Sequence, residues 1–542
     1  MISRLRHWYR GSTFAQAASG ALARWAALPP LGWEALAWIA PVWWILLARR
    51  EALPGLRPYR ALWVAGFLFW MATLHFLRLP HWTTSFGWIA LSAYLACYLP
   101  VFVGLVRVAV HRLDVPVIAA APVVWTGLEL ARGHLITGFT MASLGHTQYE
   151  WLPLIQISDV AGAYGVGFVI MFVAACLGRM LPCDGRGPSL WPLVPAAAML
   201  AAVLGYGHYR LIDEEGPPTA RVALIQGSID AELKSDPEKN AQVLDHYFTL
   251  SREALRRDAP LDLIVWPETM FRDTLITFDP NPKAPEASGL SNDIFREQLD
   301  AAAWRSRRIL EMASERFEVP AILGIDTFHY GEDGPRRFNS AVFLDTSGEI
   351  RGRYDKMHLV LFGEYIPFGN WFPALQRLTP LPVNLDPGLE PQAFEVGRLR
   401  YAPSICFETV LPHVIRRQVL ELGRRGREPD VLVNLTNDGW FRGSSELDLH
   451  LICGIFRAVE CRKPLLIAAN TGFSAWIDGD GRVRAQGPRR KTAALLAEVR
   501  PEGRTSWYLA HGDLFAGTCL VATLGFAAAG LWGRWRRVIG SQ

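Results

Sequence analysis

The hydrophobic pattern divides the chain into regions of different character. Before residue 210, apolar segments follow one another, and each approaches the ~20 residues that a helix needs to cross the hydrocarbon of a bilayer. Five are clear, at roughly 33–48, 61–77, 88–111, 161–178 and 190–208, and two weaker ones lie near 12–28 and 116–131. We therefore predict a multi-pass α-helical membrane bundle of about seven spans over residues 1–210.

The two weaker segments each contain a charged residue, and one more apolar segment lies near the C-terminus. Arg24 and Glu129 would have to face other helices rather than lipid. A cleavable signal peptide explains the pattern poorly, because apolar segments continue long past the first. The segment 514–533 predicts a last transmembrane helix, so residues 509–542 are expected to form that helix and a cytoplasmic basic tail.

The distribution of arginines predicts the orientation. With the N-terminus in the cytoplasm, most arginines of this region fall in the inner turns, and the outer turns hold only Arg78, Arg132 and Arg210. Cytoplasmic loops carry such an excess, so residues 211–508 are predicted to lie outside the cytoplasm. The bundle could be a plain anchor, or its outer loop 133–154 could shape a lateral opening for lipid, and the pattern leaves both open.

From Arg221 the pattern changes to short β-rich runs separated by polar helices. We predict strands at 221–229, 261–268, 319–328, 339–346, 399–407, 430–437 and 464–472. Apolar spacing predicts helices at 236–258, 296–316 and 450–461. Ser-Gly and Asp-Gly turns indicate two hairpins. Buried strands alternating with helices predict a layered α/β extramembrane domain over residues 211–508.

Composition narrows the class of protein. Of 542 residues, 51% are hydrophobic and only 20% are charged, which fits a membrane protein carrying a soluble part. The formal net charge is +4, and no basic stripe interleaved with aromatics indicates nucleic-acid binding. The seven cysteines form no CxxC pair and the histidines have no ligand spacing, so neither a disulfide scaffold nor a metal site is expected.

Three stretches carry residues suited to catalysis. Glu268 ends the strand LIVWPE, Lys356 follows a hairpin in GRYDKMHL, and Cys406 ends the strand RYAPSIC. Alone, each has an ordinary explanation as a helix-capping carboxylate, a solvated loop lysine or a buried thiol. Together they supply a nucleophile, a carboxylate that can take its proton and a cation that can hold an oxyanion. This is a minimal set for acyl transfer.

These stretches resemble the carbon–nitrogen hydrolase (nitrilase) superfamily, whose members have an αββα sandwich and a Glu–Lys–Cys triad. The resemblance implies that Glu268 in VWPET is the general base, Lys356 in YDKMHLVLFGEY the lysine and Cys406 in SICFE the nucleophile. Glu364 in FGEY matches a supporting glutamate. The stretch NLTNDGWF (434–441) matches the characteristic Asn-Asp-x-Trp-Phe loop. Spans before and after this domain match one branch, the bacterial apolipoprotein N-acyltransferases.

The resemblance implies further roles and shows two departures. Glu408 is expected to brace the pocket, and the loop residues Asn437, Asp438 and Trp440 are expected to support the triad rather than react. Family members usually have a tyrosine after the nucleophile and a tryptophan in the first loop. This chain has Phe407 and Ser235 at those positions, so substrate positioning is expected to differ more than the triad.

The function that this resemblance implies is N-acylation of lipoproteins. A fatty acyl chain would pass from a phospholipid, through a thioester on Cys406, to the N-terminal amine of a diacylglyceryl-cysteine lipoprotein, without cofactor or metal. Lys356 is expected to favour the thiolate of Cys406. The implied location is the bacterial inner membrane, with the catalytic domain on the periplasmic side. The implied partners are the phospholipid donor, the lipoprotein acceptor and membrane lipids.

An aromatic stretch, 357–382, is predicted to form a membrane-facing arm over the site. It contains five aromatic residues within a short distance, namely Phe362, Tyr365, Phe368, Trp371 and Phe372. An internal core loop is the alternative.

Two other functions remain open from the sequence. A membrane-anchored amidase of the same superfamily would use the same triad to hydrolyse a small C–N bond. A membrane scaffold with a degenerate nitrilase-like domain is the non-enzymatic alternative, and the presence of Glu268, Lys356, Glu364 and Cys406 argues against it.

Overall fold

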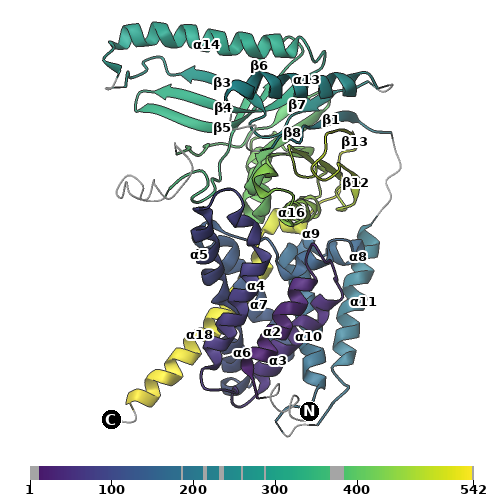
Figure 1. The fold of residues 1–542 in the computed structure, drawn as a ribbon. Helices are drawn as coiled ribbons and strands as arrows, with labels where there is room; N and C mark the ends of the chain where they lie inside the picture. Colours follow the sequence, from purple (N-terminus) through teal and green to yellow (C-terminus); the bar gives the residue numbers. More distant parts are fainter. Residues whose placement is uncertain are drawn as a thin grey trace. The chain divides into compact units, whose positions relative to one another are not determined.

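The computed structural model describes residues 11–184, 187–211, 217–230, 237–257, 260–285, 288–366 and 384–539. The chain separates into two compact units (Figure 1). The first comprises Met1–Arg78, Thr84–Asp213 and Ser506–Gln542, and the second comprises Leu79–Thr83 and Glu214–Thr505. The main boundaries lie within a few residues of the places where the hydrophobic pattern changes.

The regular elements described in the first unit are all helices. The longer ones are α2 (Thr13–Ala26), α3 (Leu36–Arg49), α4 (Pro58–Thr73), α5 (Thr84–Ala96), α6 (Tyr98–Arg112), α7 (Val117–His134), α10 (Ala163–Met180), α11 (Leu193–Arg210) and α18 (Leu514–Ile539). Between them lie the short helices η1 (His75–Arg78), η2 (Leu135–Thr137), η3 (Leu144–Gln148), α8 (Leu152–Ile155), α9 (Ser158–Ala161) and α17 (Trp507–His511). A helix therefore lies at each of the eight predicted apolar segments.

Three helices in the described part of the chain are long and apolar enough to cross a membrane. They are Ala163–Met180, Leu514–Trp532 and the 29-residue stretch Thr84–Arg112, in which Cys97 alone separates α5 from α6. Leu36–Arg49 and Leu152–Ala161 are apolar but shorter. Length and composition thus support part of the predicted number of spans.

Helix α7 packs against several neighbours within the first unit, including α6, α10 and α18. A glycine makes one of these contacts possible. A Cβ on Gly127 would lie 2.9 Å from the carbonyl oxygen of Cys519 and 2.6 Å from Oγ1 of Thr523, both in α18. Small residues let helix backbones approach closely in this way.

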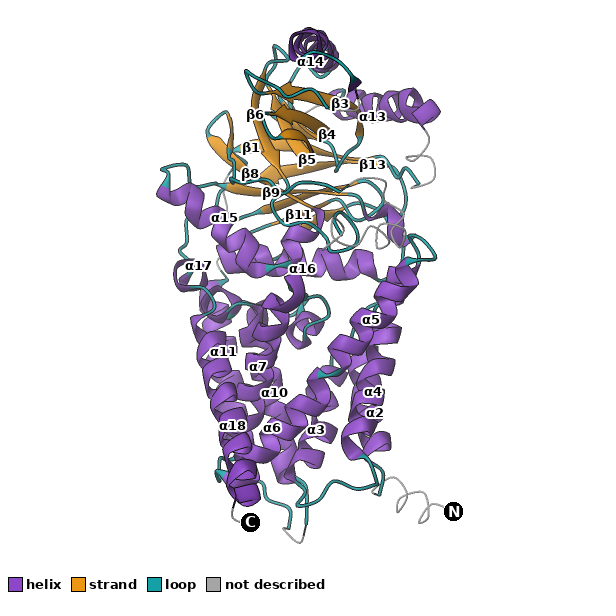
Figure 2. Ribbon diagram, turned by 90° about the vertical axis from the view of Figure 1, so that its left-hand side faces the viewer, coloured by secondary structure: helices purple, strands orange, loops and turns teal. Residues whose placement is uncertain are grey.

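The second unit contains two β-sheets (Figure 2). The first sheet has the order β13-β1-β2-β4-β5-β6, with β3 also paired to β4. Its strands are β1 (Ala220–Gln226), β2 (Leu263–Val265), β3 (Phe271–Phe278), β4 (Ala321–Gly331), β5 (Gly334–Leu344), β6 (Ile350–Asp355) and β13 (Ala493–Val499). The second sheet, in the order β12-β11-β10-β9-β8-β7, comprises β7 (Phe394–Val396), β8 (Leu399–Ile405), β9 (Val431–Thr436), β10 (Leu465–Ala469), β11 (Ala475–Ile477) and β12 (Val483–Gln486).

The two sheets pack face to face and helices cover their outer sides. One core joins residues of both sheets, such as Val222 and Val265 of the first and Val433 and Leu466 of the second. A second core joins the other face of the first sheet to α13 (Asn240–Leu255) and α14 (Asn292–Ser314). Helices α15 (Pro412–Arg424) and α16 (Glu446–Cys461) lie beside the second sheet (Figure 2). This arrangement is the predicted αββα sandwich.

Parallel pairing sets the polarity of the strands that carry the site. Strands β1, β2 and β4 are parallel neighbours in the first sheet, and β8, β9 and β10 are parallel neighbours in the second. The predicted hairpins are β5–β6 and β11–β12, both antiparallel. The seven strands predicted from the pattern are all present, and so are the three helices.

Candidate active site

The predicted triad residues come from the ends of strands in both sheets. Glu268 lies three residues after β2, Lys356 directly follows β6, and Cys406 directly follows β8. The first two belong to one sheet and the third to the other. Because the sheets pack face to face, residues at these strand ends can meet, and the contacts below show that they do.

Glu268 is buried and its carboxylate is fixed by two donors. Oε1 accepts a hydrogen bond from Nδ2 of Asn339 at 2.6 Å, and Oε2 accepts one from the backbone N–H of Asn437 at 2.9 Å. The backbone at Glu268 lies close to β4, where a Cβ on Gly324 would be 2.7 Å from Cα of Glu268. Only glycine allows that approach.

Lys356 is fully buried and lies between two carboxylates. Its Nζ is 2.7 Å from Oε1 of Glu364 and 3.8 Å from Oε1 of Glu268. Burial lowers the pKa of Lys356, but interactions with neighbouring groups, the carboxylate of Glu364 foremost, outweigh burial and leave the pKa raised. The residue is therefore a permanent cation close to Glu268, the predicted base.

Glu364 is held by a tight turn that follows Lys356. The backbone N–H of Val360 donates to Oε2 of Glu364 at 2.8 Å, and the N–H of Phe362 donates to the carbonyl of Tyr365 at 2.8 Å. Glu364 points at Lys356 while Phe362 is 48% exposed on the same turn. The turn thus joins the ion pair to the start of the predicted aromatic arm.

Cys406 sits at a sharp strand-to-turn junction. Its φ is +50°, in the left-handed region, between β8 and the 3₁₀ turn η7 (Cys406–Val410). Non-glycine residues are strained there, and such strain collects at functional sites. The carbonyl of Cys406 accepts hydrogen bonds from Nδ2 of Asn434 at 3.3 Å and, with Nε2 as donor, from His450 at 3.2 Å.

The thiol of Cys406 is a neutral group in its resting environment. Burial and then the negative charge of Glu268 raise its pKa well above the ordinary value, and the opposing effect of Lys356 is smaller. Lys356 favours the thiolate, as predicted, although burial and the neighbouring carboxylates leave the pKa of Cys406 raised. A neutral thiol needs a base at the moment of attack. Glu268 and Asp438 both raise the pKa of Cys406, and the effect of Glu268 is the larger.

Glu408 lies beneath the site, fully buried, and joins two of its segments. Its carboxylate accepts hydrogen bonds from the backbone N–H of Ile405 at 2.7 Å and of Met357 at 2.8 Å. The hydroxyl of Tyr354 donates to it at 2.8 Å. Burial raises the pKa of Glu408 and these donors oppose the rise. The residue thereby ties the strand before Cys406 to the chain beside Lys356.

The loop after β9 contacts Glu268 directly and reaches the carbonyl of Cys406 through His450. Asn437 contacts Glu268 through its N–H, whereas Asp438 accepts a hydrogen bond from Thr436 at 2.8 Å and lies 3.1 Å from Nδ1 of His450. Trp440 is 37% exposed in η8 (Asp438–Phe441). Asn437 and Asp438 thus contact Glu268 and His450 respectively, whereas Trp440 is partly exposed.

A cluster of possible metal ligands includes Asp438 of this loop. Ligand atoms of Asp438, Glu446 and His450 come within 4.8 Å of one another. However, His450 is engaged by Asp438 at Nδ1 and by Thr409 at 2.9 Å at Nε2. We interpret this cluster as a hydrogen-bonded support for the carbonyl of Cys406.

Some predicted residues lie elsewhere. Ser235, Phe368, Trp371 and Phe372 lie outside the described residues. The ring of Phe407 stacks against His358 at a centroid distance of 6.2 Å, and Tyr365 is half-buried. Sequence reasoning did not single out Asn339, which binds Glu268, or assign His450 a supporting role.

Comparison with known proteins identifies the superfamily to which the α/β domain belongs. Residues 221–508 match the family model described as carbon-nitrogen hydrolase. The protein is therefore an enzyme of the carbon–nitrogen hydrolase superfamily. Among solved structures, an amidase from Nesterenkonia sp. is similar over 54% of this chain and 93% of its own, with 18% identity and a TM-score of 0.36.

Comparison over the whole length identifies the branch. Residues 19–176 match the model described as apolipoprotein N-acyltransferase N-terminal domain. The apolipoprotein N-acyltransferase of Geobacter metallireducens is 34% identical over 519 residues, 93% of this chain and 92% of the relative. That of Rhodopirellula baltica is 32% identical over 547 residues, 94% and 95% of the two chains. The chain belongs to the apolipoprotein N-acyltransferase family.

Proposed function

We propose that this protein transfers a fatty acyl chain from a phospholipid to the N-terminal amine of a diacylglyceryl-cysteine lipoprotein, through a thioester on Cys406. Membership of the family supports the overall reaction. The observation that carries the roles of individual residues is the position of Cys406 on a strained turn, with Glu268 and Lys356 both close enough to perturb its thiol.

In the first half-reaction, Glu268 takes the proton of the Cys406 thiol as the sulfur attacks the ester carbonyl of the phospholipid. Lys356 and a backbone N–H, that of Phe407, stabilise the oxyanion of the tetrahedral intermediate. The carbon–oxygen bond then breaks, and Glu268 returns the proton to the leaving alkoxide. The products are a lysophospholipid and an acyl thioester on Cys406.

In the second half-reaction, the α-amine of the lipoprotein attacks the thioester. Glu268 takes a proton from the attacking nitrogen, the carbon–sulfur bond breaks, and the proton passes to the sulfur. The product is an amide and the free thiol is restored. Because a thioester is more reactive than an amide, this step needs no nucleotide.

The supporting residues act by position in this scheme. Glu364 orients Lys356 through the 2.7 Å ion pair, and Glu408 holds the chain on both sides of the site. Asn437 and Asp438 fix the base and, through His450, the carbonyl of Cys406. We propose that Trp440, in the same loop, supports the triad rather than reacting itself.

We further propose that residues 1–210 are a transmembrane bundle of about seven spans and that 509–542 add a C-terminal span. The catalytic domain, 211–508, would then face the periplasm from the inner membrane. Support comes from the arginine distribution and from helices at each predicted segment. Phe362, which is 48% exposed, and the half-buried Tyr365 belong to the described part of the proposed membrane-facing arm, 357–382.

The amidase alternative differs in the group that attacks the thioester. Water in place of the lipoprotein amine would release a fatty acid, and a nitrilase-type amidase would act on a small C–N bond. No observation on this chain favours that reading over acyl transfer, and the match of residues 19–176 to the N-acyltransferase N-terminal domain argues against it.

The test uses the purified full-length chain with phospholipid and a synthetic diacylglyceryl-cysteine peptide. We expect N-acylated peptide and lysophospholipid in equal amounts, and no product with Cys406→Ala. Release of free fatty acid with no acylated peptide would favour hydrolysis, and full activity of Cys406→Ala would remove the proposed nucleophile.

A further inference from the structure

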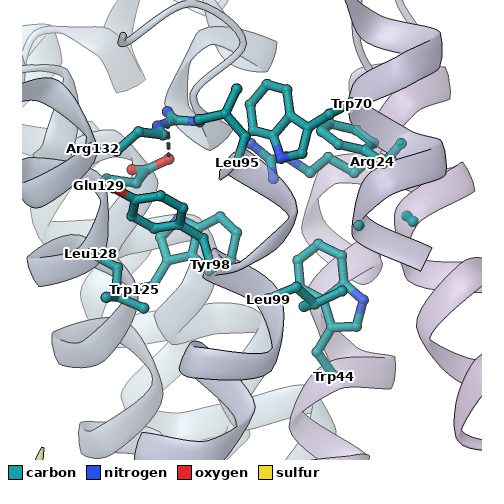
Figure 3. Close-up of a pocket in the computed structure, with 13 residues that line it drawn as sticks. Arg24, Trp44, Trp70, Leu95, Tyr98, Leu99, Trp125, Leu128, Glu129 and Arg132 are labelled. Carbon is teal, nitrogen blue, oxygen red and sulfur yellow. Dashed lines mark ion pairs between the residues drawn. The ribbon is translucent and has the colours of Figure 1, made fainter. Parts of the chain in front are cut away.

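A cavity in the helical unit brings two buried arginines to one aromatic wall (Figure 3). It has a volume of about 40 Å³, is partly open, and is lined by residues of α2, α3, α4, α5, α6 and α7. The two arginines are Arg24 in α2 and Arg132 in α7, and both guanidinium groups lie within 6 Å of the ring centre of Trp70. The aromatic wall thus gathers two like charges in a space otherwise lined mainly by apolar side chains.

Arg24 is packed mainly by rings. Its guanidinium carbon lies 4.7 Å from the ring centre of Phe69 and 5.2 Å from that of Trp125. Nη2 donates to the carbonyl of Ala142 at 2.8 Å, whereas Nε has no hydrogen-bond partner among the described residues. A guanidinium packs well against aromatic faces, but this packing leaves the N–H donors in the plane of the guanidinium unused.

Arg132 is paired, although incompletely. Its Nη2 is 3.7 Å from Oε1 of Glu129 and donates to Oγ of Ser143 at 2.6 Å. Within the described residues, Nε of Arg132 and Oε2 of Glu129 have no hydrogen-bond partner. Oε1 of Glu129 is shared, since it also accepts a bond from the N–H of Leu144 at 3.0 Å. The carboxylate of Glu129 is therefore divided between Arg132 and the backbone N–H of Leu144.

The charges of these three buried residues sum to one positive charge, because Arg24 and Arg132 face a single Glu129. Both arginines lie in the last turn of their helices, where the helix dipole favours a cation. The helix dipole explains why each position carries a positive charge. It does not explain why Nε of each arginine lacks a hydrogen-bond partner among the described residues. A buried cation that lacks a partner is costly in an apolar environment, so a monoanion fits this cavity.

A phosphodiester has the chemistry that the cavity selects. It carries one negative charge, and the planar guanidinium fork matches its oxygens. The remaining wall, which includes Trp44, Leu95 and Leu99, suits the apolar part of a lipid. By the predicted topology, the ends of α2 and α7 that carry the arginines face the same, extracytoplasmic side.

We propose that this cavity binds the phosphate of a phospholipid headgroup, with Arg24 and Arg132 as its ligands and Glu129 as the group that limits the charge. The proposal rests on the proposed function, because the acyl donor there is a phospholipid. It assigns to the helical unit a lipid-recognition site of its own, built from residues outside the triad.

Binding is measured on the full-length Cys406→Ala protein in a phosphate-free detergent, so that no acyl transfer occurs. The probes are dipalmitoyl phosphatidylethanolamine, dipalmitoylglycerol with the same chains, and inorganic phosphate, and native mass spectrometry counts the bound lipid. We expect the phospholipid to bind at least 10-fold more tightly than dipalmitoylglycerol. Competition by inorganic phosphate would assign the site to phosphate in general, and its absence would assign it to the lipid headgroup. Equal binding of the two lipids would overturn the proposal.

Two variants with opposite expected effects on phospholipid binding make the test independent of folding defects. Arg24→Met should weaken phospholipid binding by about 10-fold or more, since it removes a charge-assisted contact. Glu129→Gln keeps the shape and an acceptor for Leu144 but raises the local charge, so it should tighten binding. The exposed Arg78 provides a matched control, and Arg78→Met should bind as the parent does. Weaker binding by Glu129→Gln, or unchanged binding by Arg24→Met, would contradict the proposal.

The proposed function and this site fail separately. Without an acyl adduct on Cys406 of the otherwise unchanged protein, the reaction scheme is wrong whatever binds in the helical unit. If the adduct forms while phospholipid binding is the same with and without Arg24, the scheme stands and the site is rejected.

Discussion

At the scale of single residues, the position of one ammonium group decides how the site works. Lys356 has no exposed side-chain surface, so its charge depends on neighbouring carboxylates. The closer is Glu364, at 2.7 Å, and the other is Glu268, the proposed base, at 3.8 Å. Glu364 thus keeps Lys356 from forming a tighter pair with Glu268, which would occupy the base.

Replacing Glu364 by glutamine should therefore impair chemistry more than lipid binding. The loss of a buried partner lets Lys356 move toward Glu268, and a displacement of about 1 Å can cost about 10²-fold in rate. We expect acyl-enzyme formation to slow by about that factor with phospholipid affinity unchanged. Glu395 is exposed on β7 and Glu395→Gln is the control. A Glu364→Gln protein with the parental rate would show that the ion pair has no positioning role.

The members of the proposed triad could be singled out from the sequence because a carboxylate, a lysine and a cysteine follow strand-forming runs in one domain and together resemble a known superfamily. The residues that contact and position these three could not be predicted in this way. Asn339 is 71 positions from Glu268 and His450 is 44 positions from Cys406. Both are ordinary polar residues whose neighbours are set by strand pairing. The protonation of Cys406 also depended on burial, which local sequence does not reveal.

At the scale of elements, the site depends on how closely β4 approaches the end of β2. A Cβ on Gly324 would lie 2.3 Å from the carbonyl oxygen of Pro267 and 2.7 Å from Cα of Glu268. Both are backbone atoms, so the added carbon cannot be accommodated by a side-chain rotation. The segment that holds Glu268 would have to shift.

Gly324→Ala should therefore misplace the base without unfolding the sandwich. We expect acyl-enzyme formation to fall by about 10²-fold, together with a drop in melting temperature, because overpacking costs about 1–3 kcal/mol. Gly503→Ala is the matched control, since a Cβ there meets no atom within 4 Å. Parental kinetics for Gly324→Ala would show that this close approach does not position Glu268.

Strands with strong apolar alternation were predictable, and those that depend on their partners were not. Strand β13 has the sequence AALLAEV, which local propensity does not favour as a strand, and it pairs along its whole length with β1. Strand β3 is half polar and lies off the main strand order. Helix α15 was missed although Ile415, Val419 and Leu422 have helical spacing, so its signal was present.

At the scale of the whole molecule, a reaction between two lipids explains why a nitrilase-like domain is joined to apolar helices. Drawing an acyl chain into water costs about 0.8 kcal/mol per CH₂, so transfer between a phospholipid and a lipoprotein must take place at a bilayer. The family match covers both parts of the chain, residues 19–176 and 221–508. We therefore propose that the helical unit is part of the enzyme rather than an anchor alone.

The covalent intermediate tests this account most directly. Intact-protein mass spectrometry of the full-length chain, after incubation with dipalmitoyl phospholipid and no acceptor, should show one added palmitoyl group. Peptide mapping should place it on Cys406 in a hydroxylamine-labile thioester, and Glu268→Gln should form it at least about 10²-fold more slowly. Acylated lipoprotein made by a chain that never carries the adduct, or an adduct that persists in Cys406→Ala, would contradict the central claim.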